Sequence, residues 1–510
     1  MSGKIILDGQ SLTIEQVVMV AREGCRVELD PAAAGRINSS RSIVEDYVDR
    51  EEIVYGVTTG FGRFSDVAIS RDETELLQKN LIVSHACGVG QNFSKDVTRA
   101  IMLLRVNTLC RGYSGIRLET LNLLIEMLNR GVHPCIPQKG SLGASGDLAP
   151  LAHMVLVMLG EGSAEFDGEV LKGAEALKKA GLQPCTLSSK EGLALINGTQ
   201  TMSAVAALAL FDAGMLVKMA DIAASLTIEA LNGIVDAFDA RMHEVRGHRG
   251  QIISARNIRH LVDGSTYVTK QGEKRVQDAY ALRCTAQVHG ACRDAVEYAA
   301  GIIGTEINAV TDNPLIFPDS SEVISGGNFH GEPVALAMDF LGIALAELAN
   351  ISERRIERLV NPQLSNDLPP FLTPHGGLNS GFMITQYTAA ALVSENKVLA
   401  HPASVDSIPS SANQEDHVSM GTIAARKGAE IKDNLANVLA IEYLASAQAI
   451  DLRGEGELGR GTKPAYQLLR SRIKPLQQDR IMHVDMQGAL ELILSWQPVR
   501  VAEEILGKEL

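Results

Sequence analysis

The sequence predicts a mainly α-helical protein, and three observations carry this prediction. The second half of the 510 residues contains long apolar segments whose hydrophobic positions repeat with the 3.6-residue period of a helix. The first part has shorter segments of the same kind, separated by loops that contain glycine and proline. Strand patterns are few and short. We therefore expect a long central helix bundle with a smaller, loop-rich N-terminal part.

The N-terminal part has clear local signals. Thr13-Ile14-Glu15-Gln16 resembles a capping box and predicts the start of an early helix. Glycines cluster in three loops, at residues 56–62, 88–90 and 140–146. Short hairpins are expected around Gly162–Gly168 and Phe317–Ile324.

The second half is dominated by long helical segments. The segment Pro333–Leu359 has a broad apolar stripe, gathers its charges towards its C-terminal end, and is stopped by Asn361-Pro362. Segments of the same type are Thr201–Ala237, Ala291–Ile307, Phe382–Leu399 and Met420–Ile450. Helices this apolar bury most of their circumference, which indicates faces that also meet other subunits.

The chain shows no linker that would separate independent domains. We expect a single intertwined unit over residues 1–510. Within it, residues 1–196 form the N-terminal part with the loop at residues 140–146, and residues 197–510 form the long-helix bundle.

Composition excludes several classes of protein. Hydrophobic residues make up 45% and charged residues 21% of the chain, which excludes disorder as the main state. A formal net charge of −14 argues against a nucleic-acid partner. The longest uncharged stretch contains several polar residues, so we expect a buried helix and no membrane partner. Seven widely spaced cysteines without a CxxC pair favour free thiols and a cytoplasmic location.

Three motifs carry little weight. Residues 454–459 match GxGxxG but follow a helical segment, so we expect an exposed loop. Glu415-Asp416-His417 are adjacent and point in different directions, so we expect no metal site. Ser145 and His153 keep a serine hydrolase open only as a minor alternative, because the GxSxG pattern is absent.

The most informative segment is Gly140–His153, which contains Ala144-Ser145-Gly146. A strained turn through these small residues would bring the Gly146 nitrogen close to the Ala144 carbonyl carbon. Cyclisation with loss of two waters, one of them from Ser145, would leave an exocyclic methylene at position 145. Such a group is a strong electrophile, which no ordinary side chain supplies. Ala-Ser-Gly is also common in flexible turns, so the tripeptide alone predicts only an ordinary turn.

Gly140–Pro150 resembles the signature of the aromatic amino acid ammonia-lyases, whose self-made cofactor is 4-methylidene-imidazol-5-one (MIO). The resemblance covers nearly the whole chain and rests on six further motifs in one order. These are Tyr55–Gly62, Asn197–Thr199, Gln277–Cys284, Asp312–Pro314, Gly326–His330 and Asn413–His417. It implies a lyase with MIO formed from Ala144, Ser145 and Gly146, and no metal.

The resemblance also implies roles for individual residues. Tyr55 is expected as the general base at the β-carbon, and Tyr280 lies next to the cofactor and helps proton transfer. Asn197 and Gln277 hold the cofactor oxygen or the substrate, while Asn313 and Phe329 line the site. Arg283 suits the substrate carboxylate, because a guanidinium offers a bidentate fork.

Two residues bear on the substrate ring. Ser84-His85 occupies the position that faces the substrate side chain in this family, and His85 could bond an imidazole or a phenol. Glu415 favours imidazole, because a carboxylate accepts an imidazole N–H and would be buried unpaired against a phenyl ring. We therefore expect elimination of ammonia from L-histidine to give trans-urocanate. Thr58 does not settle the substrate, since some family members acting on histidine have Asn there.

The alternatives are a lyase or aminomutase that acts on tyrosine or phenylalanine with the same cofactor, and an inactive helical scaffold. The resemblance implies an intertwined homotetramer of mainly α-helical subunits whose active sites are shared between subunits. Cys87 lies near His85, and we expect a small buried thiol there.

Overall fold

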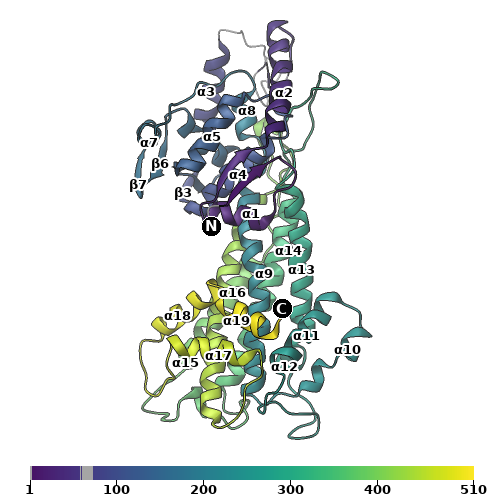
Figure 1. Ribbon diagram of the computed structural model, residues 1–510, viewed down its shortest axis with the longest axis vertical. Coiled ribbons are helices and arrows are strands. Elements are labelled where there is room, and N and C mark those ends of the chain that lie inside the picture. Colours follow the sequence, from purple (N-terminus) through teal and green to yellow (C-terminus); the bar gives the residue numbers. More distant parts are fainter. Residues whose placement is uncertain (1–2, 55, 58, 60–72) are drawn as a thin grey trace. The chain divides into compact units, whose positions relative to one another are not determined.

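A computed structural model describes residues 3–54, 56, 57, 59 and 73–510, and it confirms a mainly α-helical chain (Figure 1). The residues form two compact units. Unit 1 comprises Met1–Phe211, Ala300–Asp339 and Pro402–Arg426, and unit 2 comprises Asp212–Ala299, Phe340–His401 and Lys427–Leu510. Each unit therefore collects segments that are distant in the sequence.

Unit 1 combines medium-length helices with small sheets. Its helices are α1 (Ile14–Arg22), α2 (Pro31–Asp49), α3 (Thr74–His85), α4 (Lys95–Leu109), α5 (Leu118–Arg130), α6 (Leu148–Met158), α7 (Gly173–Lys179), α8 (Glu191–Ile196) and the 3₁₀ turn η5 (Ser411–Asn413). Its strands are β1 (Lys4–Leu7), β2 (Arg26–Leu29), β3 (Val89–Asn92), β4 (His133–Pro134), β5 (Pro137–Lys139), β6 (Ser163–Phe166), β7 (Glu169–Lys172), β8 (Leu315–Phe317) and β9 (Glu322–Ile324). β1 pairs with β2 in parallel, and the pairs β3–β5, β4–β6, β6–β7 and β8–β9 are antiparallel.

Unit 2 contains helices with little sheet between them. They are η3 (Val235–Phe238), α10 (Ala240–Glu244), α11 (Arg249–Leu261), α12 (Tyr280–Arg283), η4 (Pro370–Leu372), α15 (Met383–Leu399), α17 (Thr462–Arg472), α18 (Met482–Leu494) and α19 (Gln497–Leu506). Four long helices contribute residues to both units: α9 (Gln200–Ala230), α13 (Thr285–Glu306), α14 (Glu332–Val360) and α16 (Gly421–Arg453).

Local signals in the sequence are confirmed. Thr13 caps α1: its hydroxyl accepts from the Gln16 N–H at 3.3 Å, and the Gln16 side chain accepts from the Thr13 N–H at 3.0 Å. Both expected hairpins are present, as β6–β7 and β8–β9. The GxGxxG segment begins directly after α16 and forms a loop, as expected.

Two expected helix boundaries are wrong. α9 ends at Ala230 and not at residue 237, because Asn232 has a positive φ of 50° and the Gly233 N–H turns back to the Ile228 carbonyl at 2.7 Å. α13 begins at Thr285, six residues before the expected start. The first turns of α13 contain polar residues that are nevertheless buried, among them His289, so the apolar pattern begins too late in the sequence.

The core of unit 2 encloses a buried ionic network. Glu442 of α16 and Arg355 of α14 are fully buried, and Arg355 Nη2 donates to Glu442 Oε2 at 2.9 Å. Thr227 of α9 and Ser352 of α14 donate to the same carboxylate at 2.9 and 2.6 Å. His289 of α13 pairs with the α9 carboxylate of Asp221 at 2.8 Å. These polar contacts fix how the four long helices pack in this unit.

Within the described residues, α9 and α14 are long and apolar enough to cross a membrane by length and composition. Their apolar windows are 78% and 67% buried, which is the character of core helices. α14 still exposes Leu336, Phe340 and Ile343, spaced as one face of a helix. About half of each of these side chains is exposed in the described part of the chain, and Phe340 packs edge-on against Tyr298 of α13.

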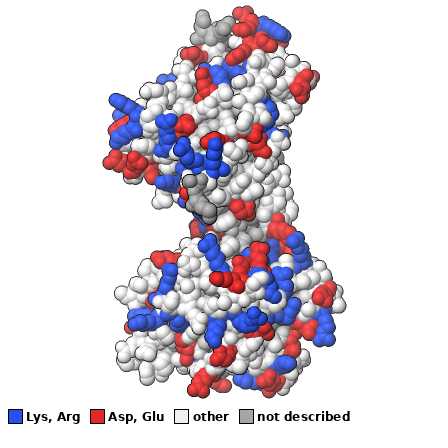
Figure 2. All heavy atoms as spheres, in the orientation of Figure 1, with Lys and Arg blue, Asp and Glu red and all other residues white. Residues whose placement is uncertain are grey.

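Figure 2 shows one face of the molecule with basic and acidic side chains intermixed on each unit. The described part of that face carries no continuous basic stripe of the kind that binds a phosphate backbone.

Replacing Arg355 by Met is expected to lower the free energy of unfolding by about 3–5 kcal/mol, because the Glu442 carboxylate would stay buried without its cation. Denaturant unfolding followed by circular dichroism measures this change. The matched control is Lys463→Met, which removes the cation of the exposed Lys463–Glu457 pair and should leave the unfolding curve in place. Equal losses of unfolding free energy in the two variants would contradict the prediction that the buried pair matters more for stability than the exposed pair.

Candidate active site

The segment 140–147 forms a tight turn before α6. Gly143 and Gly146 form an antiparallel bridge, with Ala144 and Ser145 at the tip of the turn. Both glycines have a positive φ, of 75° and 72°. A Cβ at Gly146 would lie 2.2 Å from the Gly198 carbonyl oxygen, and one at Gly143 would lie 2.3 Å from Ser419 Oγ. Only glycine fits at either position, so the backbone is pressed from both sides.

Asp147 fixes the end of this turn. Its N–H donates to the Gly198 carbonyl at 2.7 Å. Its fully buried carboxylate accepts from Ser141 Oγ at 2.9 Å, from the Met202 N–H at 2.8 Å and from the Thr422 hydroxyl. Burial raises the pKa of the Asp147 carboxyl, and these hydrogen bonds oppose the rise. The carboxylate thus ties the turn to the start of two long helices.

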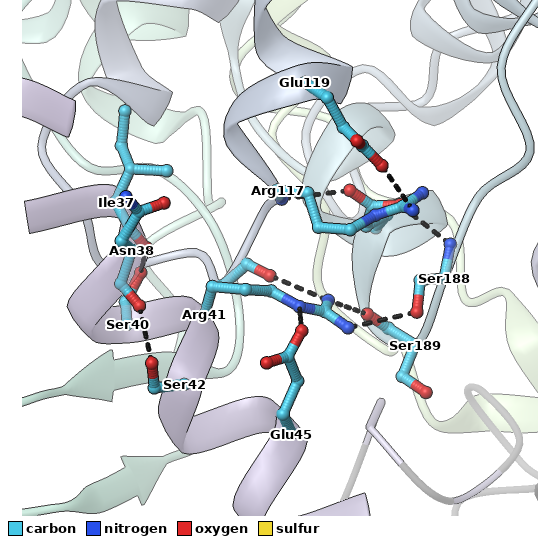
Figure 3. Close-up of polar contacts among 12 residues, drawn as sticks. Ile37, Asn38, Ser40, Arg41, Ser42, Glu45, Arg117, Glu119, Ser188 and Ser189 are labelled. Atoms are coloured by element: carbon cyan, nitrogen blue, oxygen red, sulfur yellow. Dashed lines mark hydrogen bonds and ion pairs between the residues drawn. The ribbon is translucent and has the colours of Figure 1, made fainter.

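Gly198 belongs to a second segment, which Figure 3 shows being anchored before α8. Arg41 of α2 donates to the Ser189 carbonyl at 2.9 Å and to Ser188 Oγ at 3.0 Å. Arg117 donates through its N–H and its Nε, both at 3.0 Å, to the buried carboxylate of Glu191. These contacts fix the chain that enters α8 and therefore the position of Asn197 at its end.

Asn197 and Asn313 meet behind the turn. Asn197 Nδ2 donates to the Asn313 carbonyl at 3.0 Å, and the Asn313 N–H donates to Asp312 at 2.7 Å. Asp312 forms a fully buried ion pair with Lys190 at 2.7 Å. Asn197 Oδ1 is buried and has no hydrogen-bond partner among the described residues. Asn313 turns its side chain to the 325–326 segment, where its Oδ1 accepts from the Gly326 N–H at 2.6 Å.

Beside the tripeptide lies a cavity of about 230 Å³ that is lined by residues of unit 1. Ser145 Oγ donates to Glu415 Oε1 at 3.1 Å, and Ser410 Oγ donates to Glu415 Oε2 at 3.0 Å. His85, the last residue of α3, also lines the cavity, and its Nδ1 lies 3.1 Å from Ser84 Oγ. Burial lowers the pKa of His85, although the Glu415 charge opposes this. The imidazole is therefore neutral at pH 7.

The loop before Glu415 is strained. Ser411, Ala412 and Asn413 have φ values of 52°, 54° and 67°, which are uncommon for residues other than glycine. Ser410 and Glu415 close this loop through a backbone bridge, with N–H···O distances of 2.9 and 3.2 Å. The Glu415 side chain is therefore aimed at the cavity by both its backbone and Ser410.

Gln277, Tyr280 and Arg283 belong to unit 2. Tyr280 and Arg283 are the two ends of α12; Tyr280 is 70% exposed, and the Arg283 guanidinium lies 4.5 Å from its ring centroid. Gln277 is exposed in the preceding loop.

Asp278 holds this loop in place. Its carboxylate accepts from the Ile234 N–H and from Arg275 Nε, both at 2.6 Å. The loop that carries Gln277 and leads into α12, with Tyr280 and Arg283, thus has an anchored backbone.

The structure brings together His85, Ala144, Ser145, Gly146 and Glu415 around one cavity. Asn197 and Asn313 contact each other but do not line this cavity. Phe329 is half-buried in the turn before α14 and is not part of the cavity lining. Tyr55 and Thr58 lie outside the described residues.

One expectation is wrong. Cys87 is exposed rather than buried, because it follows the C-cap of α3 in the loop that leads to β3, and it lines the same cavity.

Three residues with evident roles were not singled out from the sequence. Ser410 orients Glu415, Asp147 closes the turn, and Arg105 contacts the segment at Asn197. Asp147 alone had a sequence signal, since it directly follows the tripeptide. Ser410 lies in an ordinary serine-containing loop. Arg105 is distant in the sequence from the residues that it contacts.

The tripeptide suits an internal cyclic group. Its Gly146 backbone is compressed against Gly198, and it consists of the smallest residues that permit ring closure. Asn197, which directly precedes Gly198, has a buried Oδ1 without a hydrogen-bond partner among the described residues. The described residues include no group of three or more His, Cys, Asp or Glu side chains that could hold a metal ion.

The site thus combines a helical fold with a compressed Ala-Ser-Gly turn beside a cavity that His85 and Glu415 line. The comparisons give the family: residues 12–471 match the model of the aromatic amino acid lyases, and the chain belongs to this family.

Individual relatives agree with this assignment. The chain is 61% identical to the histidine ammonia-lyase of Alkaliphilus metalliredigens (strain QYMF) over 504 residues, 99% of each chain. Among solved structures it is similar to histidine ammonia-lyase from Trypanosoma cruzi, with a TM-score of 0.92, 43% identity and coverage of 99% and 96% of the two chains. It is also similar to tyrosine aminomutase from Streptomyces globisporus, with a TM-score of 0.94, 38% identity and coverage of 98% of each chain.

Asp278→Asn is expected to loosen the loop that carries Gln277, because the new NH₂ group faces the donors of Ile234 or Arg275. Amide hydrogen exchange within residues 270–283 should become about tenfold faster. Asp294→Asn is the matched control, since Asp294 accepts from the Gly250 N–H elsewhere in unit 2. Unchanged exchange in Asp278→Asn would show that this carboxylate does not hold the loop.

Proposed function

We propose that this chain eliminates ammonia from L-histidine to give trans-urocanate, using MIO formed from Ala144, Ser145 and Gly146. The choice of histidine as substrate rests on the position of the Glu415 carboxylate, which lies 3.1 Å from the Ser145 hydroxyl in a cavity that His85 also lines. Imidazole offers that carboxylate an N–H donor, whereas phenyl offers none. High identity to curated histidine ammonia-lyases supports the same substrate.

The chemistry needs both an electrophile and a base, because ammonia is a poor leaving group and the β-hydrogen of the substrate is weakly acidic. MIO supplies the electrophile at position 145. Tyr55 is the proposed base that removes the β-hydrogen, and Tyr280 assists proton transfer. Gly146 is buried against Gly198, which excludes water from one side of the reacting region.

The remaining residues orient the substrate and cofactor. Arg283 binds the substrate carboxylate, and its Nε has no hydrogen-bond partner among the described residues. Asn197 and Gln277 hold the cofactor oxygen or the substrate through their amides. Asn313 and Phe329 complete the wall of the site.

His85 and Glu415 bind the imidazole ring of the substrate in different ways, one as a neutral ring and the other as an anion. The lowered pKa of His85 keeps its ring neutral, so it donates or accepts one hydrogen bond without repelling a cationic substrate ring. The Glu415 carboxylate stabilises positive charge on the substrate ring.

The assembly is a proposed homotetramer in the cytoplasm, with active sites shared between subunits. The exposed stripe Leu336, Phe340 and Ile343 on α14 supports an interface, since long apolar surfaces are normally covered. Residues 1–510 are proposed to act as one intertwined unit, with the cofactor loop in residues 1–196 and the helix bundle in residues 197–510.

Incubation with L-histidine, L-tyrosine and L-phenylalanine separately is expected to give urocanate absorbance with histidine alone. Ser145→Ala is the control, because it cannot lose the serine hydroxyl and should give no product. Coumarate or cinnamate as the main product would keep the cofactor and reassign the substrate to tyrosine or phenylalanine. An intact mass without loss of two waters would identify an inactive scaffold.

Glu415→Gln is expected to lower kcat/KM for histidine about 10- to 100-fold, which corresponds to the loss of one hydrogen bond to a charged group. Cofactor content, read from intact mass, is measured in parallel so that a binding defect is separated from a maturation defect. Asp416→Asn is the matched control, since Asp416 is exposed and does not line the cavity. Histidine turnover equal to wild type in Glu415→Gln would remove Glu415 from substrate recognition.

A further inference from the structure

Arg105 of α4 is a fully buried guanidinium whose hydrogen-bond partners are all neutral. Its Nη1 donates to the Asn197 carbonyl at 2.9 Å and to Gln200 Oε1 at 2.6 Å, and its Nη2 donates to the Ala194 carbonyl. Burial lowers the pKa of Arg105 to about 10, with the Asp312 charge opposing this, so the group stays charged at pH 7. Burying a cation on neutral acceptors is costly, so these contacts are a poor source of net stability.

The acceptors of Arg105 surround the turn between α8 and α9. α8 ends at Ile196, and the last carbonyls of a helix lack donors within the helix. The guanidinium supplies these donors to Ala194 and Asn197 and simultaneously reaches Gln200 in the first turn of α9. A planar fork thereby fixes the direction of the turn, which a single ammonium cannot do.

Gly198 lies in this turn, directly between Arg105 and the tripeptide. A Cβ on Gly198 would lie 2.6 Å from Arg105 Nη1 and 2.5 Å from Gln200 Oε1. On the other side, the Gly198 carbonyl accepts the Asp147 N–H at 2.7 Å, and Gly198 forms a bridge with Gly146. The guanidinium therefore supports the strand of backbone against which Gly146 is pressed.

We propose that Arg105 is a positioning residue for cofactor formation: it holds the Asn197–Gly198 turn so that Gly198 compresses Gly146 towards Ala144. The inference rests on the proposed function, because it requires that the tripeptide cyclises. In that reaction the Gly146 nitrogen bonds to the Ala144 carbonyl carbon, and the carbonyl oxygen leaves with the amide hydrogens of Ser145 and Gly146 as one water. The Ser145 hydroxyl leaves with its α-hydrogen as the second water. Arg105 touches none of the reacting atoms.

The test compares Arg105→Met and Arg105→Lys with Arg99→Met and Arg99→Lys. Arg99 is a buried arginine of the same helix that donates to the Val20 and Leu128 carbonyls at 2.9 and 3.1 Å, away from the tripeptide. Soluble, folded protein is analysed for its thermal midpoint and, by intact mass, for the rate at which newly folded chains lose two waters. We expect all four variants to lose stability, and only the Arg105 variants to cyclise about 10- to 100-fold more slowly. Arg105→Lys is expected to recover less than half of the cyclisation rate that Arg105→Met loses, because lysine lacks the paired N–H donors of a guanidinium.

The outcomes separate the two proposals. A wild-type chain that never loses two waters overturns the proposed function and, with it, the role of Arg105. A dehydrated wild type together with folded Arg105→Met that cyclises at the wild-type rate overturns the role of Arg105 alone.

If the Arg105 variants do not fold, the Gln200→Met variant tests the proposed role of Arg105 instead. This change removes the acceptor that holds Nη1 on the Gly198 side, together with the Gln200 hydrogen bonds to Thr108 and Thr311, and leaves the arginine in place. Cyclisation several-fold slower than wild type in folded Gln200→Met supports the proposal, and an unchanged rate contradicts it.

Discussion

The geometry of the candidate site depends on one backbone hydrogen bond, from the Asp147 N–H to the Gly198 carbonyl at 2.7 Å. It joins two chain segments that are closer than any residue with a Cβ would allow, since a Cβ on Gly146 would lie 2.2 Å from the same oxygen. The groups around it serve this contact. The Asp147 carboxylate ties the turn to Met202 and Thr422, and the α8–α9 turn is backed by Arg105. A flexible Ala-Ser-Gly turn in solution would rarely visit such a compressed state.

Several of the supporting groups are buried charges, which are a poor way to gain stability. A buried ion pair such as Lys190–Asp312 gains about as much from attraction as it loses from desolvation. Its benefit is direction: Asp312 receives the Asn313 N–H, and Asn313 in turn receives the amide of Asn197. Unit 2 uses Arg355 and Glu442 in the same way to fix the packing of long helices whose apolar surfaces alone would tolerate sliding.

Features that depend on near neighbours could be predicted from the sequence. The long helices follow from periodicity, the start of α1 follows from Thr13 and Gln16, and the tripeptide is singled out by the resemblance of Gly140–Pro150 to the ammonia-lyase signature. What could not be predicted depends on contacts between distant positions: Arg105 reaches Asn197 across 92 residues, and the burial of His289 rests on a partner in another helix. The end of α9 was predicted wrongly because a positive φ at Asn232 ends the helix, although the apolar pattern continues beyond that residue. The placement of Gln277, Tyr280 and Arg283 in a different unit from the tripeptide has no signature in their spacing.

The strained loop at residues 411–413 has an evolutionary consequence. Its shape is set by backbone torsions and by the bridge between residues 410 and 415, so the backbone at position 415 keeps its direction whatever the side chain, whereas the Ser410 hydrogen bond depends on the carboxylate. A substitution at position 415 changes what the cavity recognises without refolding the loop or disturbing the compressed turn at Gly146. Such a separation lets one catalytic frame serve substrates with different rings, and it places the divergence of substrate preference within reach of single substitutions.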